Sequence, residues 1–126
     1  MESWKDRVAT EARVNMTLGA VHQVASIAII AIIVFGDIAN AESGVKRLVA
    51  FAAVLGAITS WIFTSNGLMS YQDGSKDMTA AEAATAAGKN LSKQPFMIYQ
   101  IYTLAITVAT IAGTLFVVAP IAHWSF

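Results

Sequence analysis

The sequence predicts an all-α membrane protein, a single membrane domain over residues 1–126 with three transmembrane helices, a short N-terminal interfacial helix and one short Ala-rich loop helix. Of the 126 residues, 56% are hydrophobic, a larger share than a soluble domain of this length carries. The charged side chains are confined to an N-terminal stretch and to the segments 37–47 and 73–93. The long segments between these clusters lack Lys, Arg, Asp and Glu, so each is suited to cross lipid.

The first span is preceded by a charged segment. Residues 1–14 place Trp4 and Val8 at helical spacing, and Ser3 followed by Asp6 has the form of an N-terminal cap, which indicates a short interfacial helix. The apolar segment 15–38 follows. About 20 residues at a rise of roughly 1.5 Å match a hydrocarbon core of roughly 30 Å, so we expect this segment to cross the bilayer.

The second span covers residues 48–70 and the third covers residues 97–122. Because the link DIANAESGVKR is short and polar, the first two spans must be antiparallel neighbours. A polar connector, 71–95, precedes the third span. Pro95 suits the first turn of that helix, where its missing N–H donor is not needed.

The connector carries the signals of one short helix. Asp73 followed by Gly74 is typical of a turn, and Thr79 and Glu82 have the spacing of a capping box. An Ala-rich stretch follows, and Gly88 is expected to end it. We therefore predict a single short helix within a polar loop.

Lys and Arg residues are distributed unevenly between the two sides. Positively charged residues in short loops stay on the cytoplasmic side of a membrane. Six lie before the first span or in the connector, and two lie in the link. The count predicts a cytoplasmic N-terminus and an outer C-terminus. We expect the membrane to be a bacterial inner membrane. The six are Lys5, Arg7, Arg13, Lys76, Lys89 and Lys93, and the two are Lys46 and Arg47.

A signal-peptide interpretation competes for the first span. Ala39, Asn40 and Ala41 have the small-x-small form of a cleavage site after an apolar run. The preceding region is long and partly acidic for a signal sequence, which favours a retained span. Cleavage would leave a two-span hairpin.

A polar stripe runs along the inner half of the first span. Its members recur at helical spacing, with Gln23 beside them: Asn15, Gly19, His22 and Ser26. Polar groups in hydrocarbon need partners, so the stripe faces another helix, another subunit or water. It either lines a polar passage or fixes helix register through interhelical hydrogen bonds, and we favour the second interpretation.

Small residues follow each other every four positions on the other two spans. Such rows let helix backbones approach closely in lipid. Either both rows serve one contact within the chain, or at least one faces a second copy, which is the arrangement we favour. The rows are Ala52, Gly56, Ser60 and Thr64 on the second span, and Ala105, Ala109 and Gly113 on the third.

Several function classes are disfavoured. His22 and His123 are separated by most of the bilayer, on the order of 20 Å, and cannot share a metal or haem within one chain. We predict no metal site and no cofactor, although bound lipid is compatible with the sequence. Phosphate-loop, nucleophile-elbow and zinc-helix motifs are absent, which argues against an enzyme. Balanced charge argues against direct nucleic-acid binding.

The last two spans resemble the pilins of type IV secretion and conjugation systems. The likeness rests on the Ala/Gly-rich AFAAVLGAITS, the basic connector ending GKNLSK and the apolar LAITVATIAGTLFVVA, and it covers about two thirds of the chain. It implies a helical hairpin with a cytoplasmic basic loop, whose subunits polymerise. The long connector and a retained first span depart from that pattern.

The leading hypothesis is a non-enzymatic, self-associating structural subunit of a membrane-embedded assembly, most concretely secretion or conjugation machinery or its pilus subunit. Its partners would be membrane lipid and either further copies of itself or a larger membrane complex. Two alternatives stay open. One is an accessory subunit of a respiratory or photosynthetic complex, and the other is a phage-type holin, whose N-terminus commonly lies outside.

Overall fold

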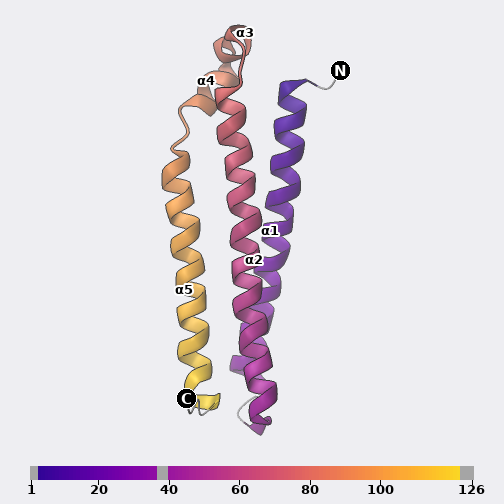
Figure 1. Ribbon diagram of the computed structural model, residues 1–126, viewed down its shortest axis with the longest axis vertical. Coiled ribbons are helices and arrows are strands. Elements are labelled where there is room, and N and C mark those ends of the chain that lie inside the picture. Colours follow the sequence, from indigo (N-terminus) through magenta and orange to yellow (C-terminus); the bar gives the residue numbers. More distant parts are fainter. Residues whose placement is uncertain (1–2, 37–39, 123–126) are drawn as a thin grey trace.

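The computed structural model describes residues 3–36 and 40–122, and every regular element in these ranges is a helix. Three long helices form an elongated bundle, and two short ones lie at one end of it (Figure 1). The helices are α1 (Trp4–Phe35), α2 (Ser43–Lys76), α3 (Ala80–Ala84), α4 (Ala86–Ser92) and α5 (Phe96–Ala122). The predicted fold class, an all-α membrane protein with three spans, is confirmed.

The three long helices are long and apolar enough to cross a membrane over Trp4–Ile33, Gly44–Lys76 and Phe96–Phe116. With 32 and 34 residues, α1 and α2 are about 48 and 51 Å long at the α-helical rise. Both exceed a hydrocarbon core of roughly 30 Å, so their ends project beyond it.

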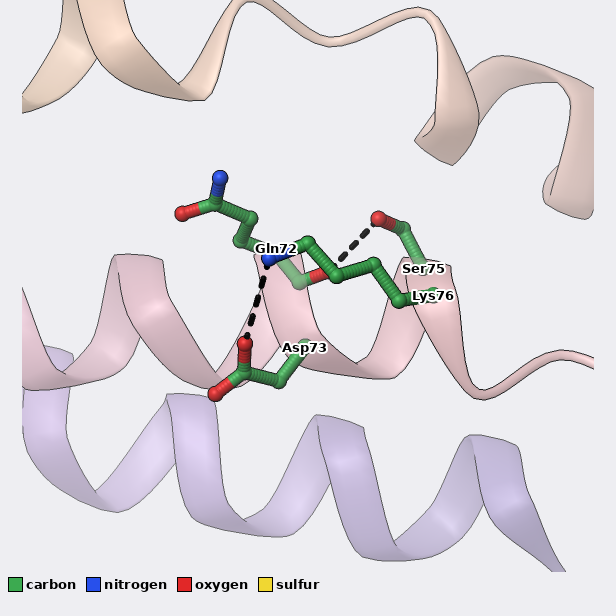
Figure 2. Close-up of polar contacts among 4 residues, drawn as sticks. All are labelled: Gln72, Asp73, Ser75 and Lys76. Atoms are coloured by element: carbon green, nitrogen blue, oxygen red, sulfur yellow. Dashed lines mark hydrogen bonds and ion pairs between the residues drawn. The ribbon is translucent and has the colours of Figure 1, made fainter.

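Polar side chains occupy the projecting end of α2, shown close up in Figure 2. Lys76 Nζ lies 3.8 Å from Asp73 Oδ1, and their side chains are 65% and 72% exposed. The Ser75 hydroxyl donates to the Gln72 carbonyl oxygen at 2.6 Å. Because an exposed ion pair belongs in water and not in hydrocarbon, this end of α2 lies outside the membrane core.

The middle helix of the bundle is α2, which packs along both α1 and α5, whereas α1 and α5 hardly touch each other (Figure 1). The start of α1 lies at the same end as α3 and α4, while the end of α1 and the start of α2 lie at the other. This arrangement leaves much of α5 outside the intramolecular packing.

The N-terminal segment differs from the expected interfacial helix, because it is the first part of α1 and continues without a break into the first span. The Ser3 cap is confirmed, since its hydroxyl accepts from the Asp6 N–H at 3.2 Å. Val8 and Ala12 are only 7% and 0% exposed. Val8 packs against Gly74 at the projecting end of α2, and the Ala12 carbonyl oxygen faces Gly67. These contacts keep the segment along the bundle and not flat on the membrane surface.

The structure of the connector also differs from the single short helix that the sequence predicts. Gly74 lies within α2, where a Cβ would come within 2.5 Å of a Val8 methyl carbon, so its small size serves packing and not a turn. The capping box of Thr79 and Glu82 is confirmed. Two short helices follow, because Thr85 caps a second one, and Gly88 lies inside that helix and does not end the first.

Candidate functional site

The main contact within the chain is a seam between α1 and α2, made of small residues with the exception of Ile33. Its members recur every seven positions on each helix, the repeat of a coiled coil, and every one of them is buried. Antiparallel helices with such a repeat keep their buried faces together along their whole length. The α1–α2 seam consists of Ala12, Gly19, Ser26 and Ile33 on α1 and of Ala53, Ser60, Gly67 and Gly74 on α2.

The closest approach in the seam is at Gly19. A Cβ there would overlap Thr64 Oγ1 and would lie 3.1 Å from the Thr64 backbone nitrogen and 3.2 Å from the Ser60 carbonyl oxygen. Ser60 Oγ donates a hydrogen bond of 2.8 Å to the Gly19 carbonyl oxygen. A similar approach joins Gly56 to Ser26, since a Cβ on Gly56 would lie 2.5 Å from Ser26 Oγ.

The sequence-predicted polar stripe and the small row of the second span thus meet in one contact. Gly19 and Ser26 of the stripe lie against Gly56, Ser60 and Thr64 of the row. Ala52, the remaining member of the row, is half-buried at its flank. The interhelical bond from Ser60 to Gly19 is of the kind that fixes register.

The other stripe residues have different surroundings. The Asn15 amide nitrogen donates to its own helix, to the Glu11 carbonyl oxygen at 3.0 Å. His22 stacks on Phe63, with ring centroids 5.6 Å apart. Ser26 is fully buried, and its hydroxyl has no hydrogen-bond partner among residues 3–36 and 40–122.

Gln23 lines a cavity of about 320 Å³ between α1, α2 and α5. The walls also include Trp61, Thr64 and Thr107. The indole nitrogen of Trp61 is buried and lacks a hydrogen-bond partner within the described part of the chain. A polar passage, the interpretation of the stripe that the sequence did not favour, would have to use this cavity.

The contact between α2 and α5 depends on a polar pair that the sequence patterns did not indicate. Ser65 Oγ donates to Gln100 Oε1 at 2.7 Å, and Gln100 Nε2 donates to the Ser65 carbonyl oxygen at 3.1 Å. The threonine hydroxyls of α5 donate instead within their own helix, as from Thr107 to the Thr103 carbonyl oxygen at 3.0 Å.

The small row of the third span lies on the outer side of α5. Ala105, Ala109 and Gly113 are all exposed. A Cβ at Gly113 would meet no atom within 4 Å in the part of the chain that the structure describes. The buried Thr114, 3% exposed, marks the opposite, inward side. We call Ala105, Ala109 and Gly113 the outer α5 row.

Within residues 3–36 and 40–122, no group of three or more His, Asp or Glu side chains is placed to hold a metal ion. His123 and Ala39, the first residue of the cleavage-like Ala39-Asn40-Ala41, lie outside the described residues. The chain matches no protein-family model, no curated protein sequence and no solved structure.

Proposed function

We propose that this protein is a non-enzymatic, self-associating structural subunit of a membrane-embedded assembly, and that the outer α5 row is the contact between copies. The observation that carries the proposal is the exposure of Ala105, Ala109 and Gly113 on a helix that packs on one side only. The charge-free α5 lies against lipid wherever it has no protein neighbour.

Contact with lipid alone does not explain why small residues, and not large apolar ones, form the outer α5 row. Leucine or phenylalanine satisfies a lipid-facing position as well as alanine or glycine does, because acyl chains are as apolar as those side chains. Small residues every four positions become useful when another helix backbone approaches along the row. The contact between α1 and α2 of this same chain has such approaches at Gly19 and at Gly56, where a Cβ would collide with the neighbouring helix.

The most concrete form of the proposal is secretion or conjugation machinery in a bacterial inner membrane, with the chain as a pilin-like subunit. It is supported by the Ala/Gly-rich α2 and the apolar α5, joined by a connector that carries Lys89 and Lys93. The excess of Lys and Arg on this side favours a cytoplasmic N-terminus and an outer C-terminus. Reporter fusions at each terminus test the orientation.

The sharpest test replaces Gly113 by leucine, which adds bulk to the outer α5 row and keeps the helix apolar. Gly44→Leu is the matched control, because a Cβ at Gly44 also meets no described atom within 4 Å. Gly56→Leu is unsuitable as a test of assembly, since it would first disturb the contact with Ser26 inside one chain.

Light scattering and electron microscopy of the detergent-extracted protein give the particle mass and shape. We expect the unaltered chain and the control to form larger particles, and Gly113→Leu to shift the protein toward single chains. Equal particle mass for all three would contradict the proposal. Co-purification of cofactor-bearing proteins, visible in an absorption spectrum, would instead favour an accessory subunit of a respiratory or photosynthetic complex.

A further inference from the structure

A second cavity, of about 480 Å³, lies at the end of the bundle where α1 begins and α2 ends. The connector helix α4 and the start of α5 complete its walls. Its volume falls within the range of roughly 300–1,000 Å³ that is typical of small-molecule sites. Neither the α1–α2 seam nor the outer α5 row forms any part of it.

The walls of this cavity are mostly apolar. Val8, Leu68, Leu91 and Phe96 contribute hydrocarbon from four different helices. Val8, Leu68 and Phe96 are buried, at 7%, 8% and 9% exposure. A ligand that fills the cavity must therefore present an apolar portion to it.

Several polar groups around the cavity make hydrogen bonds within the chain. The indole nitrogen of Trp4 donates to the Gly74 carbonyl oxygen at 2.7 Å. Gln94 accepts from the Tyr99 hydroxyl at 2.9 Å and donates to Asn90 Oδ1 at 3.1 Å. These bonds hold α1 to α2 and the connector to α5, so the cavity is bounded by fixed walls.

Lys5 is the charged side chain in the lining of this cavity. In the described part of the chain its ammonium group has no carboxylate within 4.0 Å. Lys5 contributes least to the lowered pKa of the Glu82 carboxyl, which is lowered first by hydrogen bonds from the Thr79 backbone and side chain. The cavity thus has one cation at its edge that is available to an anionic group.

The position of the cavity along the membrane normal is indicated by the aromatic and charged residues around it. Trp4, Tyr71 and Tyr99 line it, and amphipathic aromatic side chains settle at the boundary between headgroups and acyl chains. The exposed Asp73 and Lys76 follow Tyr71 on α2 by two and five residues and lie in water. Lys5 is therefore at headgroup level, and the apolar walls are at the level of the acyl chains.

We propose that this cavity binds one membrane phospholipid, with an acyl chain against the apolar walls and the phosphate beside Lys5. The charge selects this occupant, because a phospholipid carries an anion at the level of Lys5, whereas a neutral amphiphile such as a quinone or a diacylglycerol has none. The connector helix α4 then has a role, since Ala87, Asn90 and Leu91 close one side of the site. The proposal does not depend on self-association through α5.

The test is native mass spectrometry of the full chain, delipidated in mild detergent and titrated with dioleoyl phosphatidylglycerol or with dioleoylglycerol. Ala87→Phe fills the cavity, and Ala86→Phe is its control on the adjacent exposed position, outside the lining. Lys5→Gln removes the charge, and Arg7→Gln is its control on the same exposed turn of α1. Circular dichroism verifies that each variant stays folded.

We expect one phospholipid per chain, and affinity reduced on the order of tenfold by Ala87→Phe and by Lys5→Gln, with both controls close to the unaltered chain. Lys5→Gln should also remove the preference for the phospholipid over dioleoylglycerol. Unchanged phospholipid affinity in both test variants would overturn the proposal. The proposal would also be overturned if the chain bound neither lipid and formed a dimer that Ala87→Phe abolished. A second copy of the chain would then be the occupant of the cavity. Lys5→Gln leaves the apolar walls unchanged, so its phospholipid affinity tests the proposal even if Ala87→Phe unfolds.

Discussion

Replacement of Gly19 by alanine tests the packing of the α1–α2 seam at its closest point. The added Cβ would lie 3.1 Å from the Thr64 backbone nitrogen and 3.2 Å from the Ser60 carbonyl oxygen. Thr64 can rotate its hydroxyl away, but neither backbone atom can move unless the helices separate. Overpacking of this kind costs about 1–3 kcal/mol of unfolding free energy.

The same substitution also gains helix propensity, about 1 kcal/mol for glycine to alanine. Gly113→Ala gains the same propensity at a position where no described atom lies within 4 Å of the new Cβ. The difference between the two variants therefore isolates the packing cost, and we expect Gly19→Ala to be less stable than Gly113→Ala by about 1–3 kcal/mol. Equilibrium unfolding in mixed micelles, followed by circular dichroism, measures it. Equal stability of the two variants would refute the close approach of α1 and α2 at Gly19.

Three further predictions concern the contacts that hold the helices in place. Trp4→Phe removes the hydrogen bond to the Gly74 carbonyl and should lower the unfolding free energy by about 0.5–1.5 kcal/mol; an unchanged value in the same titration would count against that bond. Gln100→Leu breaks both bonds to Ser65 and should cost about 1 kcal/mol, seen as faster amide exchange in α5 but not in α1. The pKa of Glu82 is lowered, chiefly by the backbone hydrogen bond of its capping box, so the box should hold at neutral pH. It should be lost as the pH falls below about 4.3 and through the lowered pKa, and Glu82→Gln should abolish this pH dependence in the amide shifts of α3.

The spans and the helix caps were predictable from the sequence because both depend on local features. Apolar runs of sufficient length fix the three crossings, and hydroxyl and carboxyl groups at fixed spacing fix the caps at Ser3 and Thr79. The continuity of α1 and the helical state of Gly74 were not predictable in this way. Both result from Val8 packing on Gly74, 66 positions further along the chain.

The candidate site was predictable only in part. Spacing of four identified Ser60 and Thr64, but the buried repeat of seven that includes Ala53 and Gly67 is the one along which α2 meets α1. A search for sevenfold repeats would have found it. The helix against which each row of small residues packs is decided by the tertiary structure, and local spacing does not reveal it. The bond between Ser65 and Gln100 belongs to the same class, because neither residue is part of a periodic pattern.

The central claim, that copies of this chain meet along the outer α5 row, is tested most directly by cysteine cross-linking in native membranes. The chain has no cysteine, so single substitutions report unambiguously. Ala109→Cys lies in the row, and Val108→Cys, on the adjacent 57% exposed position, points to a different side of α5. Upon oxidation we predict a disulfide-linked dimer for Ala109→Cys and little or none for Val108→Cys. Equal cross-linking at the two positions, or none at Ala109, would contradict the claim.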